Sequence, residues 1–198
     1  MIGIRKAVPD DGKDIGELML LSAPYFSILF GNNIKKVLQD LFRHPKNLFS
    51  LEHIYFAEVG GENAGMILGY DWQVKKRENL KTGFLLFKKI GFGILDKLFL
   101  LLRFNSTVGR LSYGEYYISN IATYPKFQRR GVGKRLLLEA EKEAKIVGAE
   151  RIVLDVEKEN NSAINFYQKF GYKMIDEFSI SLSRDKILNF NRMIKEMK

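Results

Sequence analysis

Residues 120–137 read NIATYPKFQRRGVGKRLL and join the end of a predicted strand to the start of a predicted helix. The loop in this stretch, residues 128–134, carries two glycines, Gly131 and Gly133, beside several cations. Glycine leaves no Cβ between the backbone and a ligand, and the N–H groups at a helix N-terminus attract anions. We therefore predict that the loop binds the phosphates of a ligand. The cations that would assist are Arg129, Arg130, Lys134 and Arg135.

Two well-known phosphate-binding loops do not fit this spacing. A P-loop needs a glycine where Gln128 stands and a serine or threonine where Arg135 stands. The dinucleotide-binding fingerprint needs a third glycine at the position of Leu136. The stretch therefore belongs to another class of phosphate-binding turn.

Working outward from this loop, hydrophobic periodicity and turn residues predict strands and helices that alternate along most of the chain. The expected strands are 2–7, 53–59, 64–70, 115–123, 151–156, 172–182 and 187–193. Four helices are expected outside the insertion: one that begins after Asp11, one over 33–42, one from the glycine loop to 147, and one that begins at a cap on Asn161 or Ser162 and ends at Phe170. This order predicts one α/β (α+β) domain over residues 1–198. We expect a mixed central β-sheet flanked by helices, with a helical insertion after the third strand.

Composition limits the classes of protein to consider. The chain has 198 residues, no cysteine and a formal net charge of +9. A disulfide scaffold, a zinc ribbon and a thiol nucleophile are excluded. The N-terminus lacks the apolar core of a signal peptide, and no apolar run approaches the ~18–20 residues that span a bilayer. We expect a cytoplasmic protein.

The basic charge is concentrated in one segment. Residues 75–110 hold nine cations and two anions, which is +7 of the chain's +9. The same region, 75–112, forms the predicted insertion, and its part 84–104 is more apolar than a solvated loop should be. Three interpretations stay open: a helical lid that packs on the sheet over a binding site, a homodimer contact, and a basic amphipathic element that rests on an anionic membrane.

A second stretch of sequence, taken together with the first, is typical of one protein family. Residues 153–172 read VLDVEKENNSAINFYQKFGY. Together the two stretches resemble the Gcn5-related N-acetyltransferase (GNAT) family. The loop resembles the family's Q/R-x-x-G-x-G/A motif, and 153–172 contains N-x-x-A-x-x-x-Y-x-x-x-G-F/Y. The resemblance is strong over 115–175, weaker over 1–72 and absent over 75–112. The second motif falls on Asn160, Ala163, Tyr167, Gly171 and Tyr172.

The resemblance implies an acetyl-CoA-dependent N-acetyltransferase that moves the acetyl group directly to a primary amine in a ternary complex. The loop would hold the pyrophosphate of CoA through its main chain, and the strand before it would pair with the pantetheine arm. Asn160 would bond to that arm, and the small Ala163 would let CoA lie close to the last helix. The other residues are Ile121, Ala122 and Thr123 on the strand, and Gln128, Arg129, Arg130, Gly131, Val132, Gly133 and Lys134 in the loop.

The resemblance also implies roles in proton transfer. Tyr167 matches the general acid that protonates the departing thiolate, although a core aromatic is the alternative reading. Glu115 and Asp155 occupy places where family members can carry a carboxylate base, and for each the alternative is a charge at the sheet surface or end. We expect no metal, because neither His44 nor His53 has a carboxylate or a second histidine at ligand spacing in the sequence.

The acceptor stays open at this stage. Protein N-termini, lysine side chains, polyamines and small antibiotics are all taken by this fold. A protein N-terminus is favoured, because residues 120–133 are most similar to ribosomal-protein N-terminal acetyltransferases. The alternative function is a catalytically silent CoA-binding sensor or interaction module. Despite the basic charge, we expect no nucleic-acid binding, because no recognised module is present.

Overall fold

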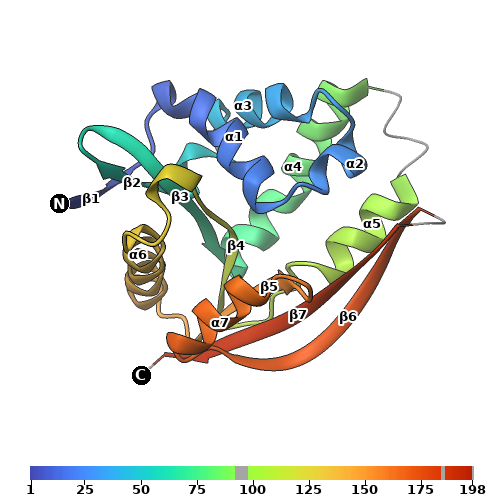
Figure 1. Ribbon diagram of the computed structural model, residues 1–198. Coiled ribbons are helices and arrows are strands. Elements are labelled where there is room, and N and C mark those ends of the chain that lie inside the picture. The colour runs from blue at the N-terminus through green and yellow to red at the C-terminus, as the bar shows by residue number, and fades with distance from the viewer. Residues whose placement is uncertain (92–97, 184–185, 198) are drawn as a thin grey trace.

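A computed structural model describes residues 1–91, 98–183 and 186–197, without the side chain of residue 98. Its strands form one mixed sheet in the order β1-β2-β3-β4-β5-β7-β6 (Figure 1). Neighbouring strands are antiparallel except for β4 and β5, which are parallel. The expected mixed sheet is confirmed. The strands are β1 (Ile2–Lys6), β2 (Ile54–Val59), β3 (Glu62–Asp71), β4 (Glu115–Thr123), β5 (Arg151–Glu157), β6 (Lys173–Ser183) and β7 (Lys186–Glu196).

Helices cover both faces of this sheet (Figure 1). On one face, α1, α2, α3 and α4 bury a core that includes Leu18, Leu38 and Phe56. On the other face, α6 and α7 bury a second core around Leu136 and Ile152. The helices are α1 (Gly12–Ser22), α2 (Phe26–Phe30), α3 (Ile34–Arg43), α4 (Trp72–Ile90), α5 (Leu98–Thr107), α6 (Val132–Ile146) and α7 (Asn161–Lys169), with short 3-10 turns η1 (Pro9–Asp11), η2 (Leu51–His53) and η4 (Pro125–Phe127).

The centre of the sheet has a defect where β4 leaves β5. The parallel pairing ends at Ile118 opposite Leu154. On its other edge, β4 pairs Ile118 with Gly69 and Asn120 with Leu68, so that Ser119 is an extra residue in a β-bulge. A bulge reverses the alternation of side chains. Tyr117 and Ala122 therefore face the same core although they differ in parity.

The insertion begins earlier than the sequence indicated. Helix α4 starts at Trp72, and Asp71 caps it by accepting a hydrogen bond from Val74 N at 2.7 Å. Gly91 ends this helix with φ 77°. The sequence predicts that Gly91 and Gly93 divide the insertion into two helical pieces, and Gly93 lies outside the described residues. Helix α4 packs on β3 and β4, so the insertion lies against the sheet.

Two further details differ from the sequence prediction. The short helix α2 was not predicted, because five residues are too few to show a period. Helix α7 is capped by Asn160 rather than by Asn161 or Ser162, since Asn160 Oδ1 accepts a hydrogen bond from Ala163 N at 3.1 Å. Among the described residues, no helix combines the length and apolarity needed to cross a membrane.

Candidate active site

The divergence of β4 from β5 creates a groove in the middle of the molecule. It encloses a cavity of about 240 Å³ between the two strands and helix α7. The cavity brings together most of the residues that the family resemblance assigned to cosubstrate binding. Those that line it are Ile121, Ala122, Thr123, Gln128, Asn160, Ala163 and Tyr167.

The glycine loop lies at the C-terminal end of β4 and opens helix α6. Gly131 is the N-cap of α6 with φ 85°, a left-handed conformation that favours glycine. Its neighbour Arg129 also has a positive φ, 59°. No side chain caps this helix, so the N–H groups of its first turn remain available to an anion. Arg129, Arg130 and Lys134 are exposed, whereas Val132 is buried and anchors the turn in the core.

These features fit an extended ligand with phosphates at one end. Beyond Ile118, the edge of β4 that faces β5 has no strand partner among the described residues. Its backbone groups can therefore pair with a ligand as another strand would. The side-chain oxygen of Asn160 accepts the hydrogen bond that caps α7, so its side-chain nitrogen is the group that can donate to such a ligand. The groove fits the pantetheine and pyrophosphate of CoA.

Tyr167 lies at the wall of the same groove and is 6% exposed. Its ring packs between Phe166 and Tyr172, with the Tyr167 and Tyr172 centroids 5.7 Å apart. Burial raises the pKa of the Tyr167 hydroxyl well above its ordinary value of 10. The hydroxyl therefore stays protonated at neutral pH and can donate a hydrogen bond.

Asp155 also lines the groove, but its carboxylate is fully engaged. Arg192 Nε donates to Oδ1 at 2.8 Å and Arg192 Nη2 to Oδ2 at 2.9 Å. Gly109 N donates to Oδ2 at 2.7 Å, and the Tyr117 hydroxyl donates at 3.2 Å. The Asp155 side chain is 0% exposed. The geometry gives it the role of an anchor that ties the end of the insertion to β5.

Glu115 is engaged in a similar way at the start of β4. It accepts a hydrogen bond from Ser112 N at 2.6 Å and pairs with Arg151 at 3.0 Å. It is not among the residues that line the groove. Sequence reasoning could place both carboxylates on the right strands, but it could not show their partners, because Arg192 is 37 residues away from Asp155.

A third carboxylate, Glu157, was missed. It lies at the splayed end of β5 and lines the groove. Burial, followed by the negative charge of Glu159, raises the pKa of Glu157 above its ordinary value. Its charge in turn contributes to the raised pKa of Tyr25, after the larger effect of burial. Glu157 thus stands near Tyr25 as a carboxylate of increased basicity.

A small polar cluster lies at the bulge of β4. Ser119 Oγ donates to Asn120 Oδ1 at 2.8 Å, and Asn120 Nδ2 donates to Ser22 Oγ at 2.8 Å. Ser22 Oγ in turn donates to Met19 O at 2.9 Å. Sequence reasoning missed this cluster, since a bulge leaves no signal in one sequence. Ser119, Asn120 and Tyr25 line both the groove and a second cavity, of about 420 Å³, beneath the insertion.

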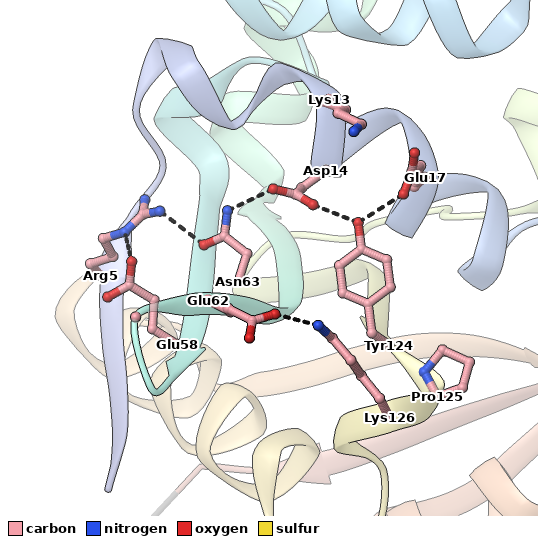
Figure 2. A pocket seen from close by; sticks show the side chains of 11 residues that line it. Arg5, Lys13, Asp14, Glu17, Glu58, Glu62, Asn63, Tyr124, Pro125 and Lys126 are labelled. Carbon is pink, nitrogen blue, oxygen red and sulfur yellow. Dashed lines mark hydrogen bonds and ion pairs between the residues drawn. The ribbon is translucent and has the colours of Figure 1, made fainter.

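A charged pocket of about 750 Å³ lies at the entrance to the glycine loop (Figure 2). The Tyr124 hydroxyl donates to Asp14 Oδ1 at 2.6 Å and to Glu17 Oε2 at 3.2 Å. Asn63 Nδ2 donates to Asp14 Oδ2 at 2.8 Å, and Asn63 Oδ1 accepts from Arg5 at 2.9 Å. These side chains are bound to one another, so the pocket braces the loop entrance against α1 and the β2–β3 turn.

His53 has carboxylates close to it in the structure, although its sequence spacing indicated none. Its Nε2 lies 2.8 Å from Glu78 Oε2, and Glu52, His53 and Glu78 offer ligand atoms within 4.8 Å of one another. The sequence could not show this, because Glu78 lies on α4, 25 residues away. Glu78 also bonds to Arg77, and Glu52 accepts from Lys46 N. The His53–Glu78 pair therefore ties η2 to α4, and we assign no metal to these three residues.

A groove between two splayed strands, with the free N–H groups of a helix start at one end, defines an α/β protein with room for an extended phosphate-bearing ligand. Residues 24–172 match the model of the acetyltransferase (GNAT) family. The chain belongs to this family, which confirms the resemblance, the fold and the enzyme class expected from the sequence.

The chain is also similar to individual acetyltransferases. It is 35% identical over 60 residues to a Bacillus subtilis (strain 168) protein called uncharacterized N-acetyltransferase YdgE; the match spans 30% of this chain and 38% of that relative. An N-acetyltransferase from Staphylococcus aureus Mu50 shares the fold with a TM-score of 0.73 and 19% identity over 98% of this chain and 100% of that chain. A Bacillus subtilis acetyltransferase in complex with CoA matches with a TM-score of 0.56 and 18% identity over 100% and 98%.

Proposed function

We propose that this chain is a single N-acetyltransferase domain that transfers the acetyl group of acetyl-CoA directly to a primary amine within a ternary complex. One observation carries the proposal. The groove opens where the β4–β5 pairing ends at Ile118, and it is bordered by Tyr167 and by Gln128 at the start of the glycine loop. It meets a second cavity at Ser119 and Asn120. Two substrates can therefore meet at the bulge of β4.

The cosubstrate would lie along β4 with its phosphates at the loop. The N–H groups of residues 129–134 would hold the pyrophosphate, and Ile121, Ala122 and Thr123 would pair with the pantetheine arm. Asn160 would donate its side-chain N–H to that arm, and Ala163 leaves room for it. Bound there, acetyl-CoA supplies an activated acetyl group as a thioester. Backbone N–H groups at the bulge would polarise the thioester carbonyl, which is an oxyanion-type contribution.

Tyr167 would act on the leaving group. The amine nitrogen forms a bond to the carbonyl carbon, the carbon–sulfur bond breaks, and the sulfur leaves with the electron pair. The buried Tyr167 hydroxyl donates a hydrogen bond to that sulfur and passes its proton as negative charge develops. The second proton that the amine nitrogen must lose then restores the Tyr167 hydroxyl, directly or through a water molecule. Because the pKa of Tyr167 is raised, we expect this residue to add no titration to the pH–rate profile below pH 10.

Glu157 is the carboxylate that we propose as the base. The incoming ammonium must lose a proton before its nitrogen can attack. Asp155 and Glu115, the two carboxylates expected from the sequence, are each held by an arginine and a backbone N–H. Glu157 borders the groove, and its pKa is raised mainly by burial. It would take the proton directly or through a water molecule.

Calorimetry and an acetylation assay on two tyrosine variants test the proposal. The wild type should bind acetyl-CoA at ~100 μM, a concentration within the 1 μM–1 mM range of typical substrate constants. Tyr167→Phe should keep that affinity and lose about 10²-fold or more in kcat. Tyr172→Phe is the matched control, since its hydroxyl is buried without a partner in the described part of the chain. Absent binding would contradict the proposal, and binding without turnover in the wild type would favour a CoA sensor.

A further inference from the structure

The second cavity is built largely by the insertion. Helices α4 and α5 supply much of its wall, α2 adds Phe26 and Phe30, and β3 and β4 contribute Tyr70 and Tyr117. Leu86 and Phe26 are buried in this wall, and the Phe104 ring lies 5.7 Å from that of Tyr25. At about 420 Å³, the cavity falls in the ~300–1,000 Å³ range of ligand pockets. One small organic molecule would fit.

The outer part of this cavity is also apolar. Leu80, Phe84 and Leu102 line it and are 86%, 65% and 60% exposed. Leaving three large apolar side chains in water around one opening is unfavourable unless something covers them. A ligand with an apolar body would remove this surface from water as it enters.

The charge of the cavity excludes some ligands. Among the described residues that line it there is no aspartate or glutamate, and Lys75 is its cation. Lys75 donates a hydrogen bond to Gly109 O, and burial lowers its pKa to about 8. A ligand with a second positive charge would meet an apolar wall and a like charge, both of which oppose its binding. Polyamines and multiply charged antibiotics are poor candidates for this reason.

The inner end of the cavity is polar and reaches the groove. Ser119 and Asn120 line both spaces, and their hydrogen-bonded side chains lie at the β4 bulge. Tyr25 also borders both, and the charge of Glu157 acts on it. A molecule held in the cavity would therefore present its inner end to the groove beside polar groups and a carboxylate.

We infer that this cavity selects the acceptor and that the acceptor is a primary amine on a single uncharged, apolar body, either an alkyl chain or an aromatic ring. The inference rests on the proposed function, because it places the amine beside the acetyl group bound in the groove. The apolar body lies between α4 and α5, and the nitrogen lies at Ser119 and Asn120. The insertion, which lies outside the two sequence motifs, thereby sets the substrate class.

A series of linear amines tests the depth of the cavity. Each methylene buried adds about 0.8 kcal/mol, so kcat/KM should rise about fourfold per carbon from ethylamine until the cavity is filled. Octylamine and 1,8-diaminooctane form a matched pair of equal length, and octylamine should be preferred at least tenfold. A flat series, or a diamine that is used equally well, would overturn the inference.

Gly83 allows the cavity to be filled without disturbing the fold. It lies on α4, lines the cavity, and a Cβ added there would meet nothing within 4 Å. Gly83→Phe should reduce kcat/KM for octylamine at least tenfold and leave that for ethylamine within about twofold. Lys88→Phe adds the same ring to the same helix at an exposed position that does not line the cavity, and it should change neither value. Equal losses on both amines in Gly83→Phe would count against the inference.

Such an amine has two natural sources, a small molecule or the N-terminus of a peptide. Peptides that begin with phenylalanine or leucine should be compared with peptides that begin with aspartate or lysine. Acetylation of only the apolar peptides, or of arylalkylamines alone, supports the inference and identifies the source. A preference for charged N-terminal residues would refute it.

Direct binding separates this inference from the proposed function. Calorimetry with octylamine, in the presence of CoA, should show binding that Gly83→Phe weakens at least tenfold and Lys88→Phe does not. If acetyl transfer fails while this pattern holds, the proposed function is wrong and the apolar amine site stands. If transfer occurs but octylamine binding is unaffected by Gly83→Phe, the proposed function stands and the site is wrong.

Discussion

The groove and the apolar cavity meet at Tyr25, Ser119 and Asn120, yet they are constructed in opposite ways. The groove is lined mainly by residues 118–167, and in our proposal it binds its ligand largely through backbone N–H groups and short side chains. The cavity is lined by side chains that lie between residues 25 and 120, and much of its wall comes from the insertion. In our proposals, the cosubstrate common to the family is bound by main-chain geometry, whereas the acceptor is selected by side chains on the insertion.

The largest effect is expected at Asp155, where the two regions are joined. Asp155→Ala leaves the buried Arg192 without its partner and frees Gly109 at the end of the insertion. Removing one member of a buried ion pair costs about 3–5 kcal/mol, so the free energy of unfolding should fall by about that amount. Urea denaturation measures it.

Glu115→Ala is the control for this prediction. Its partner Arg151 is 40% exposed, so the loss should be much smaller, at most about 1–2 kcal/mol. Unchanged stability in Asp155→Ala together with a lost acidic limb of the pH–rate profile would show that Asp155 is the base instead.

The second prediction concerns Glu157 and therefore the chemistry of the groove. Glu157→Gln should lower kcat about 10²-fold while CoA affinity is retained. Because the pKa of Glu157 is raised in the folded protein, its ionisation opposes folding, and stability falls as the pH rises through that pKa. Glu157→Gln should therefore raise Tm at pH 7 while it abolishes the acidic limb of the pH–rate profile.

Glu159→Gln is the matched change for Glu157. The negative charge of Glu159 contributes to the raised pKa of Glu157. Without that charge, the acidic limb should move to lower pH while kcat at pH 7 stays within about twofold. A Glu157→Gln enzyme with normal kcat would remove this residue from the mechanism.

The difference between the two regions also explains what could be predicted from the sequence. The β4–α6 loop could be placed because its conformation is local, with a positive φ at Gly131. Asn160 and Tyr167 were placed by their resemblance to the family motif, whereas periodicity put the helix cap one or two residues too late. The bulge at Ser119 could not be predicted, because it follows from the register with β3 rather than from any local residue pattern.

The partners of the carboxylates could not be predicted from the sequence either. Asp155 and Glu78 acquire Arg192 and His53 only through the tertiary fold. The clearest sign of the apolar cavity in the sequence was an excess of apolar residues over 84–104, of which 92–97 lie outside the described residues. Helix α4 starts at Trp72, three residues before the expected insertion, and Lys75 on this helix lines the apolar cavity.

The third prediction uses the two glycines at the ends of α6. Gly131 and Gly148 have φ 85° and 70°, and an alanine at either costs about 1–2 kcal/mol of strain. The two variants should therefore lose similar stability. Gly131→Ala should also weaken CoA binding about tenfold, because the strain is relieved by moving the N–H groups that hold the pyrophosphate. Calorimetry with CoA distinguishes them, and an equal loss of affinity in Gly148→Ala would mean that helix stability, not loop geometry, sets the affinity.

The smallest effect is expected at Tyr124, in the charged pocket of Figure 2, and it tests whether that pocket only braces the groove. Tyr124→Phe removes the hydrogen bonds to Asp14 and Glu17 and should cost about 1 kcal/mol of stability. Because only the turn η4 separates Tyr124 from the loop, CoA affinity should fall about twofold to threefold, while the chain-length dependence for amines stays the same. Tyr113→Phe, at a tyrosine that is 75% exposed, should change nothing. If Tyr124→Phe altered amine selectivity and left CoA binding intact, the charged pocket would belong to the acceptor side, and the division between a main-chain groove and a side-chain cavity would have to be redrawn.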